Sequence, residues 1–219
     1  MTYSTISCQD SLNKLVQLAE LKRVVALVEN AMSEAPNKQL VITSPFNREG
    51  KTLFTAGLAV LSATRYNLRV LAVDLHWHSP GLHSCFSKEQ NYDDSSMQSA
   101  QDVFTCVQET EIKGLDILAA PRDINENQSF MGQEICLDFL EKAESEYDRI
   151  IVDTGSIFPP NRFMMDPVYF AGRAGGTVMV VLGGVTPRDM AKKATFMFEY
   201  AGARLIGVVM NQWKNPISS

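Results

Sequence analysis

Residue types that bind phosphate and Mg²⁺ occur together in the stretch SPFNREGKTLF, residues 44–54. Gly50, Lys51 and Thr52 match the end of the phosphate-loop pattern G-x-x-x-x-G-K-[ST]. In that pattern the glycine lets the backbone approach the phosphates, the lysine reaches the β and γ phosphates, and the hydroxyl is offered to Mg²⁺. Pro45 stands where the first glycine of the pattern belongs. The alternative is therefore an ordinary turn that contains Gly-Lys-Thr by chance.

Two aspartates follow apolar runs later in the chain. Asp153 closes the run in YDRIIVDTG, and Asp74 closes the run in RVLAVDL. Parallel strands place such residues at the carboxyl edge of a sheet, where folds of this kind bind ligands and Mg²⁺. We expect Thr52 and Asp153 to hold Mg²⁺, and Asp74 to be the catalytic carboxylate or to hold metal-bound water. For each aspartate the alternative is a turn residue at a strand end.

The three histidines lie close together in the sequence and are followed by a cysteine. His76, His78, His83 and Cys85 offer nitrogen and sulfur ligands of the kind that zinc or copper prefers. An extended segment after a strand does not by itself bring the His-x-His pair to His83. A metal site and a segment without metal therefore both stay open.

Length, composition and charge limit the classes of protein. A chain of 219 residues with 45% hydrophobic residues can bury one α/β core, so we expect a single nucleotide-binding domain over 1–219. The net charge of -5 argues against a nucleic-acid partner. No apolar run approaches the roughly 18 to 20 residues that span a bilayer, and we expect a cytoplasmic protein. Irregular spacing without a C-x-x-C pair predicts buried thiols at Cys8, Cys85, Cys106 and Cys136.

The elements that must position these residues alternate between strands and helices. Leucine and valine at steps of three and four predict one N-terminal helix over about 10–32. Thr186 is a candidate cap of the last helix, and Pro187 is its expected first residue. The predicted strands are 39–44, 69–75, 115–120, 149–154, 176–182 and 204–211, and the further helices are 51–65, 130–146 and 187–202. This alternation predicts an α/β fold with a mostly parallel central sheet flanked by helices, and we expect 84–114 to be a loop with a short helix.

The motifs and their order resemble the cytoplasmic bacterial tyrosine kinases of capsule and exopolysaccharide synthesis, the BY-kinases, within the ParA and MinD-like P-loop ATPases. VITSPFNREGKT resembles the first Walker motif of that family, VLAVDLHWHSPGLHSCF the second and IIVDT the third. LIGVVMN resembles the closing strand, and Glu20 and Arg23 fit the start of a Glu-x-x-Arg-x-x-Arg oligomerisation motif. The resemblance runs from about Glu20 to Asn211.

The resemblance implies a P-loop NTPase that binds ATP and Mg²⁺, with weak ATPase or phosphotransfer activity. Lys51 and Asp74 would be catalytic, and Thr52 and Asp153 would hold the metal. The nucleotide would be bound by Asn47, Arg48, Glu49, Gly50, Lys51, Thr52 and, at the adenine, Asn211. The family also implies a homo-oligomer and a membrane-embedded polysaccharide chain-length or export protein as partner, which would place the chain at the inner membrane.

Departures from the family pattern define the alternatives. His76 replaces the second aspartate of the Asp-x-Asp motif, Ala26 replaces the third arginine of the oligomerisation motif, and Phe46 replaces the extra lysine of ParA and MinD-type loops. The segment NQWKNPISS has no tyrosine where the family carries a phosphorylated cluster. The alternative functions are therefore a non-catalytic, nucleotide-dependent regulator and a ParA- or MinD-like ATPase, each acting as a binding module for a membrane partner.

Overall fold

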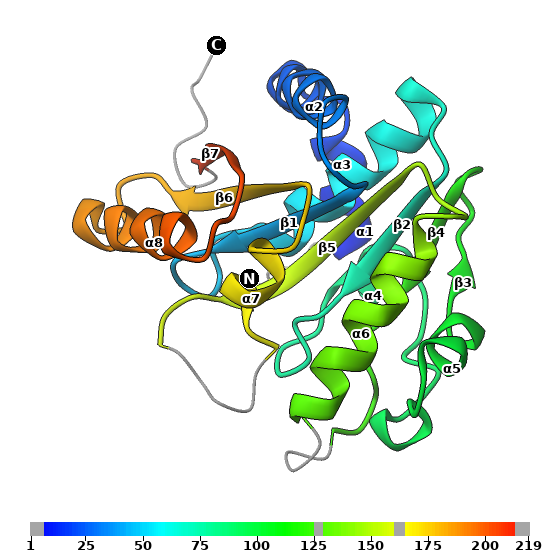
Figure 1. Cartoon of the computed structure of the whole chain (residues 1–219). Coiled ribbons are helices and arrows are strands. Elements are labelled where there is room, and N and C mark those ends of the chain that lie inside the picture. Colours follow the sequence, from blue (N-terminus) through cyan, green and yellow to red (C-terminus); the bar gives the residue numbers. More distant parts are fainter. Residues whose placement is uncertain (1–6, 125–128, 160–164, 213–219) are drawn as a thin grey trace, which may run out of the picture.

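The computed structural model describes residues 7–124, 129–159 and 165–212. Within these ranges helices and strands alternate along most of the chain (Figure 1). The helices are α1 (Cys8–Leu15), α2 (Ala19–Met32), α3 (Lys51–Tyr66), α4 (Leu82–Cys85), the 3₁₀ helix η1 (Asp94–Ser96), α5 (Ala100–Thr105), α6 (Ser129–Ala143), α7 (Pro167–Ala171) and α8 (Arg188–Tyr200). The strands are β1 (Gln39–Ser44), β2 (Val70–Asp74), β3 (Gln108–Glu109), β4 (Leu115–Leu118), β5 (Arg149–Ser156), β6 (Gly176–Leu182) and β7 (Leu205–Asn211).

The strands of the described ranges form one sheet with the order β3-β4-β2-β5-β1-β6-β7. All neighbouring strands are parallel except β3 and β4, which are antiparallel. Every residue of β1, β2, β5 and β6 is buried, as the continuous apolar runs require for strands covered on both faces. The predicted α/β fold with a mostly parallel sheet is confirmed. The description of 84–114 as a loop with one short helix is incomplete, because this segment also holds η1 and the edge strand β3.

Helices cover both faces of the sheet (Figure 1). On one face, α2, α3 and α4 contribute Val25, Leu58 and Leu82 to an apolar cluster that α1 also joins. On the other face, α6 and α8 contribute Phe139 and Phe198 to a second cluster, together with α5 and α7. Burying such a side chain typically contributes about 1.5 to 3 kcal/mol, so both layers hold the sheet firmly. No helix in the described ranges is long and apolar enough to cross a membrane.

The N-terminal segment forms two helices, so the single helix predicted over 10–32 is wrong. Leu18 has extended backbone, with φ -66° and ψ 133°, between α1 and α2. One continuous helix over 10–32 would be about 34 Å long at 1.5 Å per residue, whereas α3 is about 24 Å long. A straight helix would therefore be too long to lie along α3 over its whole length. The bend lets both helices contact α3, because a Cβ at Gly57 would lie 2.9 Å from Leu21 and 3.1 Å from Leu15. The apolar periodicity therefore predicts helical structure in this segment but not the bend at Leu18.

The expectation of four buried thiols is wrong for two of the cysteines. Cys8 of α1 and Cys85 of α4 form a disulfide with their Cα atoms 4.7 Å apart. The two residues are separated by 77 positions, so the pair has no spacing signal of its own. Cys106 and Cys136 are free and buried, as expected.

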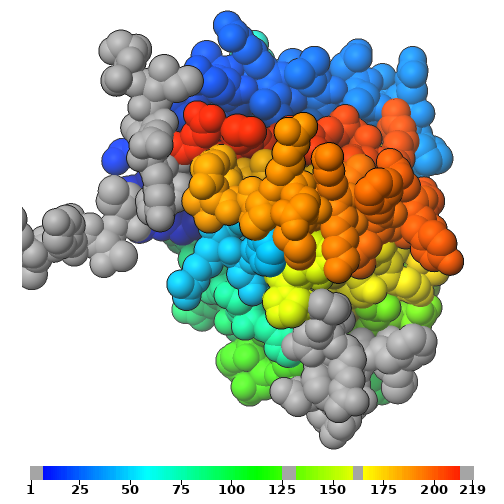
Figure 2. Space-filling model, turned by 90° about the vertical axis from the view of Figure 1, so that its left-hand side faces the viewer, coloured from blue at the N-terminus to red at the C-terminus, as the bar shows by residue number. Residues whose placement is uncertain are grey.

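Strand β7 is the last strand at one edge of the sheet, and its end lies at the predicted site. Figure 2 shows β7 (red) between α2 (blue) and α8 (orange) on one side of the molecule. Val208 and Met210 of β7 are 51% and 61% exposed. Asn211, the last residue of this strand, reaches the loop between β1 and α3.

Candidate functional site

The loop between β1 and α3 presents free main-chain amides at the carboxyl edge of the sheet. The N–H groups of residues 47–52 make no hydrogen bond within the described ranges. Gly50 lies just before α3 with φ 92°, in the left-handed region, and a Cβ there would clash with Asn211 Nδ2. Conformation and close approach therefore both require glycine. Free amides at a helix N-terminus form a site for an anion such as phosphate.

Lys51, the first residue of α3, is buried beside this loop and is only 3% exposed. Burial lowers the pKa of Lys51, while the carboxylates of Asp153, Glu49 and Asp74 oppose the shift. The ammonium group thus stands among three acids, next to the free amides. This is a suitable position from which to neutralise phosphate charge.

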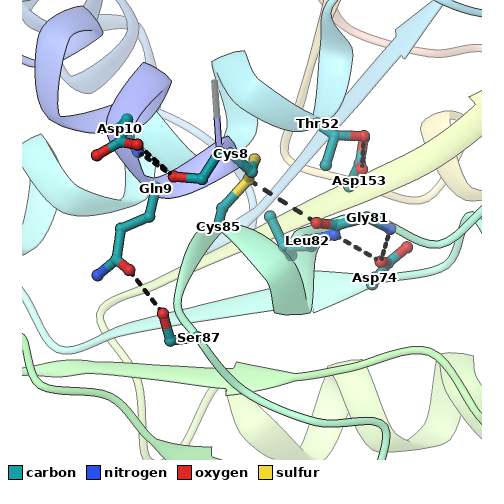
Figure 3. Close-up of a disulfide and its surroundings, with 11 residues drawn as sticks. Cys8, Gln9, Asp10, Thr52, Asp74, Gly81, Leu82, Cys85, Ser87 and Asp153 are labelled. Atoms are coloured by element: carbon teal, nitrogen blue, oxygen red, sulfur yellow. Dashed lines mark hydrogen bonds between the residues drawn. A yellow bond between two sulfur atoms is a disulfide. The ribbon is translucent and has the colours of Figure 1, made fainter. Parts of the chain in front are cut away.

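Thr52 of α3 and Asp153 of β5 lie side by side, as the sequence predicted (Figure 3). Thr52 Oγ1 donates a hydrogen bond of 2.6 Å to Asp153 Oδ2. Asp153 Oδ1 is buried and accepts no hydrogen bond from any described residue, which is unfavourable unless a ligand uses that oxygen. A hydroxyl and a carboxylate are the oxygen donors that Mg²⁺ prefers. These two residues therefore fit a magnesium ion.

Asp74 and Asp153 form a pair of buried carboxylates on neighbouring strands. They are register partners in β2 and β5, and neither has any exposed surface. Burial, with a smaller contribution from Asp74, raises the pKa of Asp153 to about 7 against the opposing effect of Lys51. β5 continues to Ser156, where it still pairs with β1, so Asp153 lies within the strand and not at its end as predicted.

The Asp74 carboxylate is engaged by main-chain hydrogen bonds (Figure 3). Oδ1 accepts a bond from the N–H of His76 at 3.0 Å, and Oδ2 accepts bonds from Gly81 at 3.1 Å and Leu82 at 3.0 Å. Burial raises the pKa of Asp74, and these three N–H groups oppose the shift. Besides the catalytic role predicted from the sequence, Asp74 holds the connection from β2 to α4 in place.

The histidines do not form the metal site that their spacing left open. Among the described residues, no group of three or more His, Cys, Asp or Glu side chains is placed to hold a metal ion. Cys85, the potential sulfur ligand, is in the disulfide. His76 is half-buried near Lys51, and burial, with the charges of Lys51 and His78, lowers the pKa of His76 to about 4. His76 is therefore neutral at pH 7.

The Glu49 side chain accepts two hydrogen bonds that hold the loop between β1 and α3 in place. Its Oε2 accepts a hydrogen bond of 2.8 Å from the Phe46 N–H, and its Oε1 accepts one from Thr186 Oγ1. Thr186 in turn accepts a bond of 2.8 Å from Leu182 at the end of β6. Thr186 was predicted to cap α8, but Pro187 is the N-cap residue and no side chain caps that helix. No pattern in the sequence indicates that Thr186 and Glu49 are in contact.

The remaining predicted residues lie around the same loop. Asn211 Nδ2 donates a hydrogen bond of 3.1 Å to the Glu49 carbonyl, and its own carbonyl accepts one of 2.8 Å from Gly183. Asn47 and Arg48 are exposed in the loop. All the predicted site residues thus lie at one edge of the sheet, and their contacts with a nucleotide stay predictions.

Comparisons with curated proteins point to bacterial tyrosine kinases. No family model matches the chain. The tyrosine-protein kinase YwqD of Bacillus subtilis is 27% identical over 185 residues, which cover 84% of this chain and 76% of that protein. The tyrosine-protein kinase ptk of Acinetobacter johnsonii is 22% identical over 197 residues, which cover 90% of this chain but only 26% of that protein.

Comparisons with solved structures find chains with a similar fold. The chimerical protein CapA2B2 matches with a TM-score of 0.72 and 25% identity, over 84% of this chain and 81% of that one. The septum site-determining protein MinD of Pyrococcus horikoshii, in complex with Mg-ADP, matches with a TM-score of 0.64 and 17% identity, over 83% and 72% of the two chains. The second likeness concerns the fold alone. The predicted P-loop fold and the resemblance to bacterial tyrosine kinases are confirmed.

Proposed function

We propose that the chain binds Mg-ATP and is a slow phosphotransferase or ATPase of capsule or exopolysaccharide synthesis. The observation that carries this proposal is the arrangement of Lys51, Thr52 and Asp153 around the free amides that precede α3. The amides and Lys51 would bind the phosphates, while Thr52 and Asp153 would hold Mg²⁺. Bound Mg²⁺ would supply charge neutralisation on the transferred phosphoryl group.

The slow turnover in this proposal follows from the presence of one acid, Asp74, and the replacement of the second acid by His76. Phosphoryl transfer depends mainly on positioning and on charge stabilisation. The proposed role of Asp74 is to orient the attacking group or accept its proton, although its oxygens also bind the amides of His76, Gly81 and Leu82. His76 occupies the position of the second acid and is neutral, so it offers no negative charge there.

Lys51→Ala tests the binding site in a calorimetric titration with Mg-ADP. Charge-assisted hydrogen bonds are typically worth about 1.5 to 3 kcal/mol, so the affinity should fall at least roughly tenfold. Lys142→Ala is the matched control, because Lys142 pairs with Asp138 at an exposed position of α6. Equal affinities of the parent and Lys51→Ala would contradict the proposal.

A second candidate is a nucleotide-dependent regulator that transfers no phosphate, and His76 is the observation that favours it. Incubation with γ-labelled ATP and Mg²⁺ separates the two candidates when released phosphate and label on protein are both scored. Slow release that is lost in Lys51→Ala supports the enzyme. Tight binding without any release supports the regulator.

The proposed partner of either form is a membrane-embedded polysaccharide chain-length or export protein, which would hold the chain at the inner membrane. The proposed homo-oligomer would use α2, where Glu20 and Arg23 are both exposed. A Glu20→Ala, Arg23→Ala double variant should then elute later than the parent in gel filtration. A parent that is monomeric with Mg-ATP present would exclude this oligomer.

A further inference from the structure

Helix α1 is joined to α4 by a covalent bond and to the residues just after α4 by a hydrogen bond (Figure 3). The Cys8–Cys85 disulfide connects the first residue of α1 to the last residue of α4. Two residues after Cys85, Ser87 Oγ donates a hydrogen bond of 2.6 Å to Gln9 Oε1 of α1. Both links hold the start of α1 against the segment that follows residues 75–81, the connection from β2 to α4, which we call the Asp74 loop.

Packing alone holds α1 weakly. Leu12 is its one buried residue, while Leu15 is half-buried against α3. A helix of this length has little stability of its own in water. The disulfide is therefore a main constraint on the position of α1.

The same disulfide lies next to the groups that form the candidate site. Cys85 Sγ is 3.8 Å from the carbonyl oxygen of Gly81. The N–H groups of Gly81 and Leu82 bind Asp74 Oδ2, and a Cβ at Gly81 would lie 3.4 Å from Thr52 Cγ2. A displacement of Cys85 would therefore move α4, and with it the Gly81 and Leu82 groups that contact Asp74 and lie near Thr52.

We propose that Cys8 and Cys85 are a reversible thiol–disulfide pair, and that the disulfide strengthens nucleotide binding by fixing α1 against α4 and the Asp74 loop. The effect on nucleotide affinity rests on the proposed function, whereas the redox chemistry of the pair does not. The other two cysteines are free thiols, and neither is as accessible as Cys8, which is half-buried. Cys136 is fully buried, which raises the pKa of its thiol to about 12, and Cys106 is also buried.

The chemistry requires a dithiol as reductant and a small disulfide such as glutathione disulfide as oxidant. Cys8 is half-buried and Cys85 is only 1% exposed, so a reductant thiolate attacks the sulfur of Cys8. A bond forms between that thiolate and Cys8, the Cys8–Cys85 bond breaks, and Cys85 leaves as a thiolate that takes a proton. The second thiol of the reductant then releases Cys8 and becomes oxidised in the same step. Two electrons and two protons reach the pair, and glutathione disulfide accepts them in the reverse direction.

Alkylation with mass spectrometry tests the pair in the native chain. After treatment with glutathione disulfide, Cys8 and Cys85 should resist iodoacetamide and appear as one linked peptide pair. Dithiothreitol should make Cys8 alkylatable in the folded protein, and renewed oxidation should restore the link. Cys136 should stay unmodified throughout. Free Cys8 and Cys85 after oxidation, or a link that persists until the chain is unfolded, would overturn the proposal.

Hydrogen exchange and calorimetry test the consequence for α1 and the site. Reduction should speed amide exchange across 8–15 and lower the affinity for Mg-ADP at least threefold. Cys8→Ser should behave like the reduced parent under both conditions, whereas Cys106→Ser should keep the redox response. Equal exchange and equal affinity in the two redox forms would refute control by the disulfide. If neither form binds nucleotide, the proposed function fails, and alkylation and exchange still decide whether the pair is reversible and holds α1.

Discussion

Glu29 of α2 and Arg149 of β5 form a buried ion pair, with Arg149 Nη2 at 2.8 Å from Glu29 Oε2. Arg149 Nε donates to the same oxygen at 3.2 Å, and Ser62 Oγ of α3 donates to Glu29 Oε1 at 2.5 Å. Both charged side chains are less than one tenth exposed. The pair therefore joins α2, α3 and the strand that carries Asp153.

Glu29→Ala should lower the free energy of unfolding by about 3 to 5 kcal/mol, because it leaves the Arg149 charge buried without a partner. Urea unfolding measures this change. Lys142→Ala is the control, since it breaks an exposed ion pair with Asp138 and should change stability by about 0.5 kcal/mol or less. A double variant, Glu29→Leu with Arg149→Met, should recover most of the loss. A single variant as stable as the parent would show that Arg149 finds another partner.

Asp153→Asn should remove the effect of Mg²⁺ on nucleotide binding. The amide keeps the size of the side chain and can still accept the hydrogen bond from Thr52, but it loses the charge that attracts Mg²⁺. Calorimetry with ADP, with and without Mg²⁺, measures the effect. We expect the gain in affinity on adding Mg²⁺ to drop about tenfold or more, while binding without Mg²⁺ persists. The same Mg²⁺ dependence in parent and variant would remove Asp153 from the metal site.

Local patterns made the central part of the candidate site predictable. The apolar run of β1, the Gly-Lys-Thr that opens α3 and the apolar run that contains Asp153 are each continuous in sequence. The parallel sheet then places Thr52 beside Asp153 without any further information, because neighbouring parallel strands share one carboxyl edge.

Contacts between distant segments were not predictable from those patterns. The Glu49–Thr186 bond joins residues 137 positions apart, and both side chains have common local uses in loops and caps. The Cys8–Cys85 pair depends on the bend between α1 and α2, which no proline or glycine marks. In both cases tertiary packing decides the contact, and a single sequence does not record it.

His76 should make the stability of the folded protein sensitive to acid. Burial lowers its pKa in the folded state to about 4, below the ordinary value of 6.5. The resulting stability is present above about pH 6.5 and is lost as the pH falls through about 4, because only the unfolded state gains the proton readily. The side chain is partly exposed, so we expect a loss of roughly 2 kcal/mol. Urea unfolding of the parent and of His76→Gln, at about pH 7.5 and about pH 4.5, should show the smaller loss in the variant. Parallel pH profiles would contradict this expectation.

Asp74→Asn should abolish hydrolysis and largely spare nucleotide binding. Lys51, Thr52 and the loop amides still contact the phosphates in this proposal, whereas the carboxylate charge is gone. The new NH₂ group faces at least one main-chain N–H that Asp74 now binds, so stability should also fall by about 1 to 3 kcal/mol. Phosphate release and calorimetry measure the two functions, and Asp138→Asn on the surface of α6 is the control. Full hydrolysis in Asp74→Asn would reduce Asp74 to its role in holding the loop.

His76→Asp tests whether the missing second acid limits the reaction. A positioned acid or base typically contributes about 10² to 10⁴ in rate, so the parent should hydrolyse ATP weakly and phosphorylate a tyrosine peptide little, if at all. His76→Asp should raise the rate of phosphate release from γ-labelled ATP. His78→Asp adds the same charge two residues away at an exposed position and should have no such effect. If the parent releases no phosphate and His76→Asp gains nothing, the chain is a nucleotide-dependent regulator. Brisk phosphorylation of the peptide by the parent would instead show that the neutral His76 does not slow the transfer.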